Sequence, residues 1–191
     1  MLVGHNWFEK IISLENLFSS WQEFRRGKRQ KLDVQFFEWR LEDNLFRLNF
    51  ELENGFYRHG SYQSFRISDP KPRLIHKATV RDRVVHHAVC RILYPLFDKN
   101  FIFDSYSCRL DKGTHRAVDR LALFLDNVSR HNRQTVFAAK CDIKKFFASV
   151  DHEILEKLLR RRIADVKVEK LLGNIISSFS AEPKPVGGGA T

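Results

Sequence analysis

The stretch 136–152, VFAAKCDIKKFFASVDH, decides how the rest of the chain is interpreted. Alternate residues from Phe137 to Ile143 can face a core while their neighbours face the other way, which predicts a strand over Val136 to Ile143. Asp142 comes at the end of this strand on its more open face, and Asp151 is suited to begin a helix as its N-cap. A carboxylate held at the end of a buried strand is a favoured ligand for Mg²⁺. The alternative is that Asp142 only caps a turn.

The composition indicates a folded, basic protein. Of the 191 residues, 43% are hydrophobic and 13% aromatic, which excludes a disordered chain. The formal net charge of +10 favours a polyanionic partner, with nucleic acid ahead of an anionic membrane. No apolar run reaches the roughly 18 residues that span a bilayer, and no secretory signal is recognisable, so we expect a cytoplasmic protein without a membrane partner.

The three cysteines, Cys90, Cys108 and Cys141, are odd in number and have no paired spacing. We therefore expect reduced thiols rather than a disulfide framework. His86 and Cys90 lie four residues apart on a predicted helix, a spacing that can hold a transition metal. No second pair completes a tetrahedral site, so packing or a helix-surface role is the preferred interpretation.

The N-terminal region is predicted to be helical, with one basic loop. Apolar residues recur at a helical period over Trp7–Phe24 and over Asp33–Leu52, the second helix stopping at Asn54-Gly55. The loop between them is RRGKRQK, and its five basic residues suit contact with nucleic-acid phosphates. A solvated charged turn is an equally good interpretation. The basic residues are Arg25, Arg26, Lys28, Arg29 and Lys31.

A β-hairpin is predicted from Tyr62 to Ile75, because aromatic and β-branched runs flank the turn SDPKP, residues 68–72. Further helices are predicted over Asp82–Phe97, from Thr114, over Asp151–Ile163 and over Val166–Phe179. The helix from Thr114 should bury Ala117, Val118, Leu121, Phe124 and Leu125. The last stretch, AEPKPVGGGAT, is either a linker or the point at which a domain is interrupted. These elements indicate an α+β fold with helices on an antiparallel sheet.

Four segments in this order resemble the N-terminal part of bacterial reverse transcriptases of the group II intron, retron and diversity-generating retroelement kind. The resemblance runs from about Leu45 to the end of the chain. YQSFRISDPKPRLI (62–75) resembles the fingers hairpin, and RDRVVHHA (81–88) resembles the helix after it. SYSCRLDKGTHRA (105–117) resembles the SYGFR-type segment, and KCDIKKFFASVDH (140–152) resembles motif A. Several ordered motifs are more specific than any one of them.

The resemblance implies a role for particular residues. Asp142 would be the first catalytic, metal-binding aspartate, and the carbonyl of Ile143 would help to coordinate the nucleotide-bound ion. Phe147 would lie under the incoming sugar and reject a ribose 2′-hydroxyl, while Arg73, helped by Lys71, would contact the triphosphate. The implied substrates and partners are an RNA template, a DNA primer or product and dNTPs, and an accessory protein is a further candidate. The implied organisation is a helical N-terminal region (1–55), followed by fingers and the first half of a right-hand polymerase palm (56–191).

Two departures from the family pattern fall at Lys145 and Ala148, away from the proposed chemistry. A larger one is that no segment matches the GxPxG-type motif B or the YxDD motif C. Transfer by two Mg²⁺ ions needs at least two carboxylates, so the sequence predicts a fragment interrupted before motif B and inactive by itself. The alternatives are a non-catalytic basic module that binds RNA and a basic platform for an acidic protein.

Overall fold

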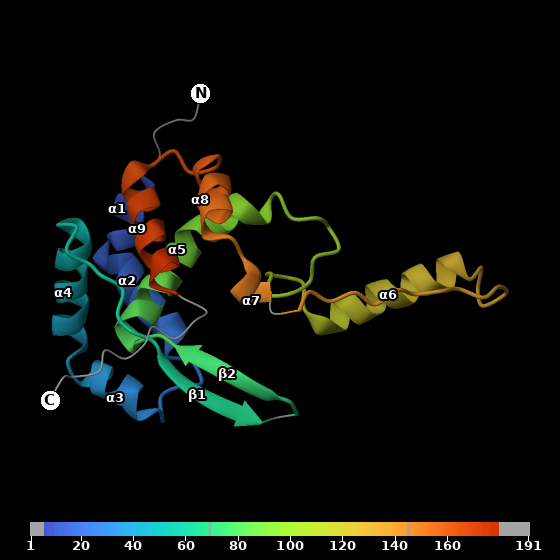
Figure 1. The fold of residues 1–191 in the computed structure, drawn as a ribbon, viewed down its shortest axis with the longest axis horizontal. Coiled ribbons are helices and arrows are strands. Elements are labelled where there is room, and N and C mark those ends of the chain that lie inside the picture. The colour runs from blue at the N-terminus through green and yellow to red at the C-terminus, as the bar shows by residue number, and fades with distance from the viewer. Residues whose placement is uncertain (1–5, 69, 145, 180–191) are drawn as a thin grey trace, which may run out of the picture. The chain divides into compact units, whose positions relative to one another are not determined.

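The computed structural model describes residues 6–68, 70–144 and 146–179. Asp69, Lys145 and the C-terminal stretch AEPKPVGGGAT lie outside the described residues. The described chain combines helices with one small antiparallel sheet (Figure 1). No helix in these ranges is both long and apolar enough to cross a membrane.

The chain divides into two compact units. The first contains residues up to Leu93 together with those from Phe146 onward, and the second contains Tyr94–Lys145. The first unit therefore joins two segments that are separated in sequence by about a quarter of the chain. The predicted boundary between residues 55 and 56 stays a prediction.

Two predicted N-terminal helices are each split in two. The first becomes α1 (Trp7–Ile12) and α2 (Leu14–Phe24), because Ser13 takes extended angles of φ −52° and ψ 141°. The Ser13 side chain accepts a hydrogen bond from the Asn16 N–H and so begins α2. The second becomes α3 (Leu32–Trp39) and α4 (Leu41–Glu53), with the break at Arg40. Gly55, with a φ of +71°, follows the end of α4 where the sequence predicts a stop.

The core of the first unit is helical. Helix α1 packs on α2, α4 and α9 (Val166–Ser178), and α2 packs on α4, so these helices lie side by side in Figure 1. Burial of apolar side chains stabilises this cluster at roughly 25 cal/mol per Å². The largest side chains that are almost completely buried are Trp21, Phe24, Ile11, Leu17, Leu45, Leu48, Ile163, Val34, Val84, Val85 and Val168.

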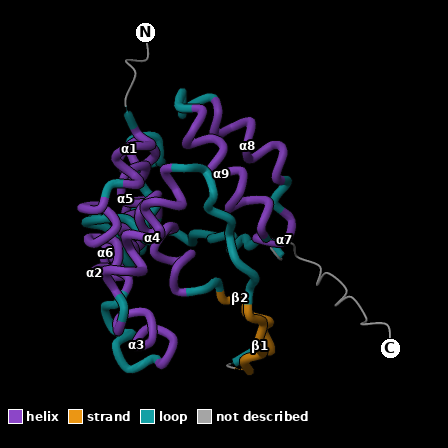
Figure 2. Tube along the Cα trace, turned by 90° about the vertical axis from the view of Figure 1, so that its left-hand side faces the viewer, coloured by secondary structure: helices purple, strands orange, loops and turns teal. Residues whose placement is uncertain are grey.

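The predicted β-hairpin is confirmed. Strands β1 (Gln63–Ser68) and β2 (Pro72–Lys77) pair antiparallel, with Gln63 opposite Lys77 and Ser68 opposite Pro72. They are the orange segments of Figure 2. Every residue of β1 is exposed, and β2 is exposed over its first half. Because an isolated two-stranded hairpin is marginal in water, its position depends on the residues that anchor its base.

Three further helices of the first unit, α5 (Val80–Asp98), α8 (His152–Arg160) and α9, also agree with prediction, whereas the short helix α7 (Phe146–Ser149) was not predicted. Helix α5 continues through Pro95, and its last turn lies in the second unit. Helix α8 packs on α9, and each begins with an aspartate cap. Asp151 accepts a hydrogen bond from the Ile154 N–H at 3.0 Å, and Asp165 accepts them from the first turn of α9.

The second unit corrects two predictions. Helix α6 (Thr114–Val128) forms as predicted, but it has no buried residue, and its predicted inner face is exposed at Val118 and Leu121. The predicted strand over Val136–Ile143 is not formed, and Phe137 is 93% exposed. A strand requires a neighbouring strand for its ladder of hydrogen bonds, and within the described residues the only sheet is the β1–β2 hairpin.

Candidate functional site

Asp142 lies in the second unit, in the irregular segment that follows α6. Its side chain is exposed, and no described residue makes a hydrogen bond or an ion pair with its carboxylate. The neighbouring residue Ile143 is also exposed. Asp142 therefore does not cap a turn through its side chain within the described part of the chain.

Phe147 belongs to the short helix α7 (Phe146–Ser149) of the first unit. Its ring is 81% exposed and meets the ring of Phe146 edge-on, with centroids 5.4 Å apart. An exposed aromatic ring five residues after Asp142 is free to contact a ligand.

Arg73 and Lys71 are exposed cations of the hairpin. Arg73 pairs with Ile67 across the two strands, and Lys71 lies in the bend before β2. In an antiparallel pair, opposite residues share a face and alternate residues along a strand share that face. Arg73 is thus on the same face as Lys77, whose Nζ is 2.6 Å from the Asp33 carboxylate.

Asp33 fixes this face of the hairpin against the helices. Its carboxylate contacts Lys77 and also accepts a hydrogen bond of 2.8 Å from Arg83 of α5. Burial opposes its negative charge, but Lys77 and Arg83 outweigh this and hold the pKa of Asp33 below its ordinary value. Helix α3 begins at Leu32, one residue before the predicted start at Asp33, and Lys31 stands at the N-cap position.

Asp82, in the first turn of α5, anchors the segment that leads into the hairpin. Its side chain is completely buried and accepts hydrogen bonds from Tyr57 Oη at 2.9 Å, the Gly60 N–H at 3.1 Å and Thr79 Oγ1 at 2.7 Å. A buried carboxylate is tolerated only when its oxygens are paired in this way. Burial and the nearby Asp82 charge raise the pKa of Tyr57, so its hydroxyl stays a donor.

Sequence reasoning missed this network, although a signal was present. Thr79 precedes the helix and Asp82 stands three residues later, a spacing typical of helix N-terminal caps. Gly60 belongs to the same network, and the folded structure shows why a glycine is needed there. A Cβ at this position would lie 2.9 Å from Asp82 Oδ2 and 3.3 Å from Thr79 Cγ2. Only a glycine lets the backbone approach the carboxylate this closely.

Two histidines stack beside the Asp82 network. The rings of His59 and His86 are 5.1 Å apart, and their Nε2 atoms are separated by 3.1 Å. His59 Nδ1 is 2.7 Å from the Gly60 carbonyl and must donate to it, so His59 Nε2 accepts the His86 Nε2–H. Burial, followed by the proximity of His59, lowers the pKa of His86 to about 4. The His86 ring is therefore neutral near pH 7.

The basic loop has two structural cations and three free ones. Arg25 is paired with Glu38 of α3, and Lys28 Nζ donates to the Phe24 carbonyl at 2.8 Å, at the end of α2. The side chains of the other three basic residues are exposed and make no hydrogen bond or ion pair with described residues; they are Arg26, Arg29 and Lys31.

Asp142 offers a metal ion one carboxylate group. The described residues contain no cluster of three or more histidine, cysteine, aspartate or glutamate side chains placed to hold a metal. Asp104 accepts hydrogen bonds from Arg120 at 3.0 Å and Tyr106 at 3.1 Å, and these lower its pKa despite partial desolvation. Asp142 thus offers one carboxylate of the two that a two-ion Mg²⁺ site requires.

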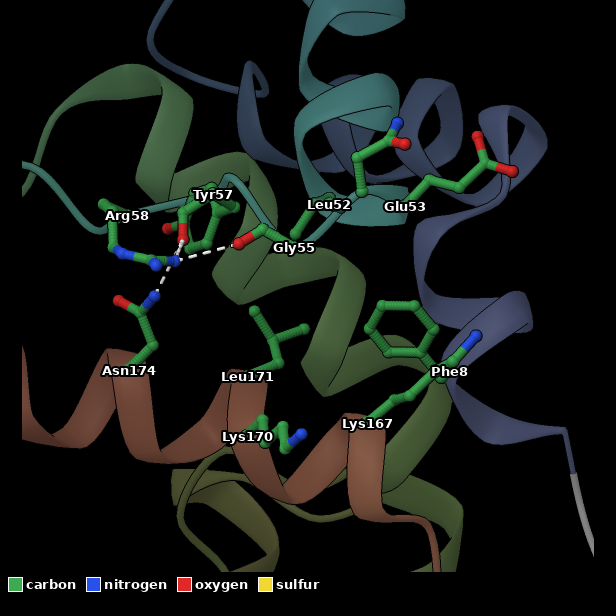
Figure 3. Close-up of a pocket in the computed structure, with 11 residues that line it drawn as sticks. Phe8, Leu52, Glu53, Gly55, Tyr57, Arg58, Lys167, Lys170, Leu171 and Asn174 are labelled. Atoms are coloured by element: carbon green, nitrogen blue, oxygen red, sulfur yellow. Dashed lines mark hydrogen bonds between the residues drawn. The ribbon is translucent and has the colours of Figure 1, made fainter.

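The first unit also contains a pocket of about 440 Å³ between α9 and the chain that follows α4 (Figure 3). Asn174 closes one side, because its side-chain amide donates to the Tyr57 carbonyl at 2.8 Å. Arg58 turns its guanidinium onto the Gly55 and Tyr57 carbonyls. The Lys167 side chain pairs with Glu9 at 3.1 Å. The polar groups of Arg58, Lys167 and Asn174 are thus paired within the protein, and Asn174 ties α9 to the segment that follows α4.

Comparison with known proteins finds a distant relative. The chain is 29% identical over 141 residues to Protein YkfC of Escherichia coli (strain K12). The match covers 73% of this chain and 36% of YkfC, so the chain spans about a third of the length of that relative. No protein-family model matches the chain.

Proposed function

We propose that the chain is part of an RNA-directed DNA polymerase, to which it contributes the fingers and the first part of the palm. The observation that carries the proposal is the exposed Asp142 carboxylate, which is free of any ion pair with described residues. It lies in the last of four ordered segments that resemble those of bacterial reverse transcriptases. A carboxylate turned into the core, or neutralised by an arginine, would have been unable to take a metal ion.

In this proposal each residue has a separate task. Asp142 and the Ile143 carbonyl offer oxygen ligands, and bound Mg²⁺ would favour attack of a primer 3′-hydroxyl and stabilise the leaving pyrophosphate. Arg73 and Lys71 attract the triphosphate, Arg73 through its forked donors and Lys71 as a point charge. Phe147 offers an aromatic face to the sugar. A second aspartate must come from elsewhere in the complete protein.

The exposure and the support of the hairpin cations favour the proposal. Arg73 is exposed on a strand whose base is tied to the helical core through Lys77 and Asp33. The Asp82 network holds the preceding segment. The cations are thus mounted on a supported element, which lowers the entropic cost of binding a triphosphate.

The test is RNA-templated extension of a labelled DNA primer with dNTPs and Mg²⁺. It uses the protein translated from the complete reading frame that contains these 191 residues. We expect extension by the unchanged protein and none after Asp142→Ala. Asp119→Ala is the matched control, because Asp119 is an exposed aspartate of the same unit without a described side-chain partner. Extension that survives Asp142→Ala would reject the proposal.

A non-catalytic RNA-binding module is the second candidate. It is favoured by the three exposed cations of the basic loop and by the lack of a three-residue metal cluster in the described ranges. RNA binding by such a module would weaken steeply with salt and would not change with Mg²⁺ or with Asp142→Ala. Polymerisation in the extension assay would exclude this candidate as the whole function.

A further inference from the structure

Helix α3 turns an apolar stripe away from the core. Leu32, Phe36 and Trp39 are spaced at i, i+4 and i+7, and their side chains are 70%, 68% and 84% exposed. The inner side of the same helix is already packed, since Val34 is buried and Phe37 lies 5.1 Å from the Trp21 ring. The stripe is therefore additional to the core, and an exposed apolar surface of this kind indicates a contact with another molecule.

Charges of opposite sign flank the stripe. On its N-terminal side are the three exposed cations of the basic loop, which ends at Lys31 directly before Leu32. On its C-terminal side Glu42 is exposed and makes no ion pair with described residues. Asp43 next to it makes only an exposed contact of 3.3 Å with Arg40. A hollow of about 670 Å³, lined by Phe18, Trp39, Glu42 and Asp43 among others, lies at this acidic end.

The order along the chain is cation, apolar stripe, acid, and at the acidic end Arg40 contacts Asp43 while Glu42 stays without an ion-pair partner among the described residues. When a second copy lies antiparallel to the first, its order is acid, apolar stripe, cation, so cations face acids and the apolar stripes face each other. A two-fold contact requires a self-complementary surface of this kind, because both copies use the same patch.

From this we propose that the α3 face is an isologous interface, across which two copies of the chain pack their α3 helices antiparallel. Phe36, in the middle of the stripe, lies nearest the two-fold axis and meets Phe36 of the second copy. Leu32 lies towards Trp39 of the second copy, and Lys31 lies towards its Glu42. This inference is independent of the polymerase proposal, since it uses neither Asp142 nor the hairpin.

The observations favour a second copy over a nucleic acid. An RNA strand would use the cations of the loop and could stack on Trp39. It would gain little from Leu32, however, and Glu42 and Asp43 would repel its phosphates. An antiparallel copy uses the cations, the stripe and the acids together.

Sedimentation velocity of the 191-residue chain over a wide concentration range is the first test. It should be run near physiological ionic strength, because two copies of net charge +10 repel each other at low salt. We expect a reversible monomer–dimer equilibrium that Phe36→Glu weakens at least about tenfold. The matched control is Phe56→Glu, the same substitution at a phenylalanine that is 66% exposed outside the stripe; it should leave the equilibrium unchanged. Circular dichroism verifies that both variants are folded.

A charge-reversal cycle is the second test and is specific for a two-fold contact. Lys31→Glu and Glu42→Lys should each weaken the dimer, because each places like charges together in both copies of the pair. The double variant should restore association, because the swapped charges again meet their opposites. A nucleic acid or an acidic protein would not give this rescue.

The inference is overturned if the chain is monomeric at every concentration, or if Phe36→Glu and Phe56→Glu weaken the dimer equally. It is also overturned if the double charge reversal fails to restore association. If the unchanged chain is monomeric and Phe36→Glu and Lys31→Glu instead reduce binding of a single-stranded RNA probe, the face belongs to nucleic acid.

Discussion

The two units of this chain use the same sequence pattern with opposite results. In the first unit the apolar stripes of α2 and α4 bury Leu17 and Leu45 completely. In the second unit α6 has an equally regular stripe, yet Leu121 and Leu125 are exposed, and Ser129 is the one buried residue among residues 94–144. An amphipathic pattern thus predicts that a helix forms and has an apolar face to bury. It does not predict whether the fold provides a surface that covers that face.

The largest effect should come from the buried carboxylate of the first unit. Asp82→Ala leaves the Tyr57 hydroxyl and the Gly60 N–H without an acceptor, and we expect it to lower the free energy of unfolding by about 3–5 kcal/mol. Urea unfolding followed by tryptophan fluorescence measures this, because Trp7, Trp21 and Trp39 all belong to the first unit. Asp119→Ala in the second unit should stay within about 0.5 kcal/mol of the unchanged protein. Equal losses of unfolding free energy in Asp82→Ala and Asp119→Ala would contradict the difference in packing between the two units.

A matched pair of leucines tests the comparison next. Leu45→Ala creates a cavity in the packed core and should cost about 2–5 kcal/mol. Leu121→Ala removes a side chain that is 54% exposed and should cost less than about 1 kcal/mol. The same unfolding experiment, with far-UV circular dichroism added to follow both units, measures the two values. A cost at Leu121 as large as that at Leu45 would mean that α6 is packed in solution.

The pH dependence of the first unit should follow His86. Its pKa falls from 6.5 to about 4 on folding, so the unfolded chain binds the proton first as the pH decreases. Stability is complete above about pH 6.5 and is lost progressively between pH 6.5 and pH 4, by up to about 3 kcal/mol. His86→Leu should flatten this slope. Burial also lowers the pKa of His87, so a shallower slope should remain. His131→Leu, which changes an exposed histidine of the second unit, should leave the slope of the unchanged protein as it is, and a slope equally steep without His86 would contradict the assignment.

The smallest expected effect comes from one methyl group. Gly60→Ala places a Cβ within 2.9 Å of Asp82 Oδ2, so the carboxylate or the backbone must shift, at a cost of about 1–3 kcal/mol. Gly27→Ala is a useful contrast, because no atom lies within 4 Å of a Cβ there, although its φ of +68° gives a backbone cost of about 1 kcal/mol. Unfolding of the two variants separates crowding from backbone strain. A loss at Gly60 no larger than at Gly27 would mean that the close approach has no cost.

Much of the first unit could be predicted from local sequence. The hairpin follows from the prolines of its turn, and the beginning of α8 follows from Asp151. The breaks at Ser13 and Arg40 could not be predicted, because the apolar period continues through both positions. The prediction of a strand over 136–143 was wrong, because a strand depends on a neighbouring strand from elsewhere in the sequence, which the local pattern does not reveal.

The candidate site was predictable to a lesser degree. Arg73 and Phe147 lie at exposed positions, and the roles that the resemblance implies for them stay predictions. The Asp82 network was missed because its members, Tyr57, Gly60 and Thr79, meet only after folding. Two of the five cations of the basic loop were misjudged, because Arg25 and Lys28 make contacts at the ends of helices. A charge count does not distinguish such residues from free cations.

The most direct test of the polymerase account is whether the Asp142 carboxylate takes a divalent ion. Mn²⁺ titrated into the isotope-labelled chain broadens the NMR signals of nearby amides, and Asp142→Asn removes one charge with little change of shape. The account predicts broadening around residues 141–143 that the substitution abolishes. Broadening centred on Asp104 or Asp111, or broadening that Asp142→Asn leaves unchanged, would contradict it.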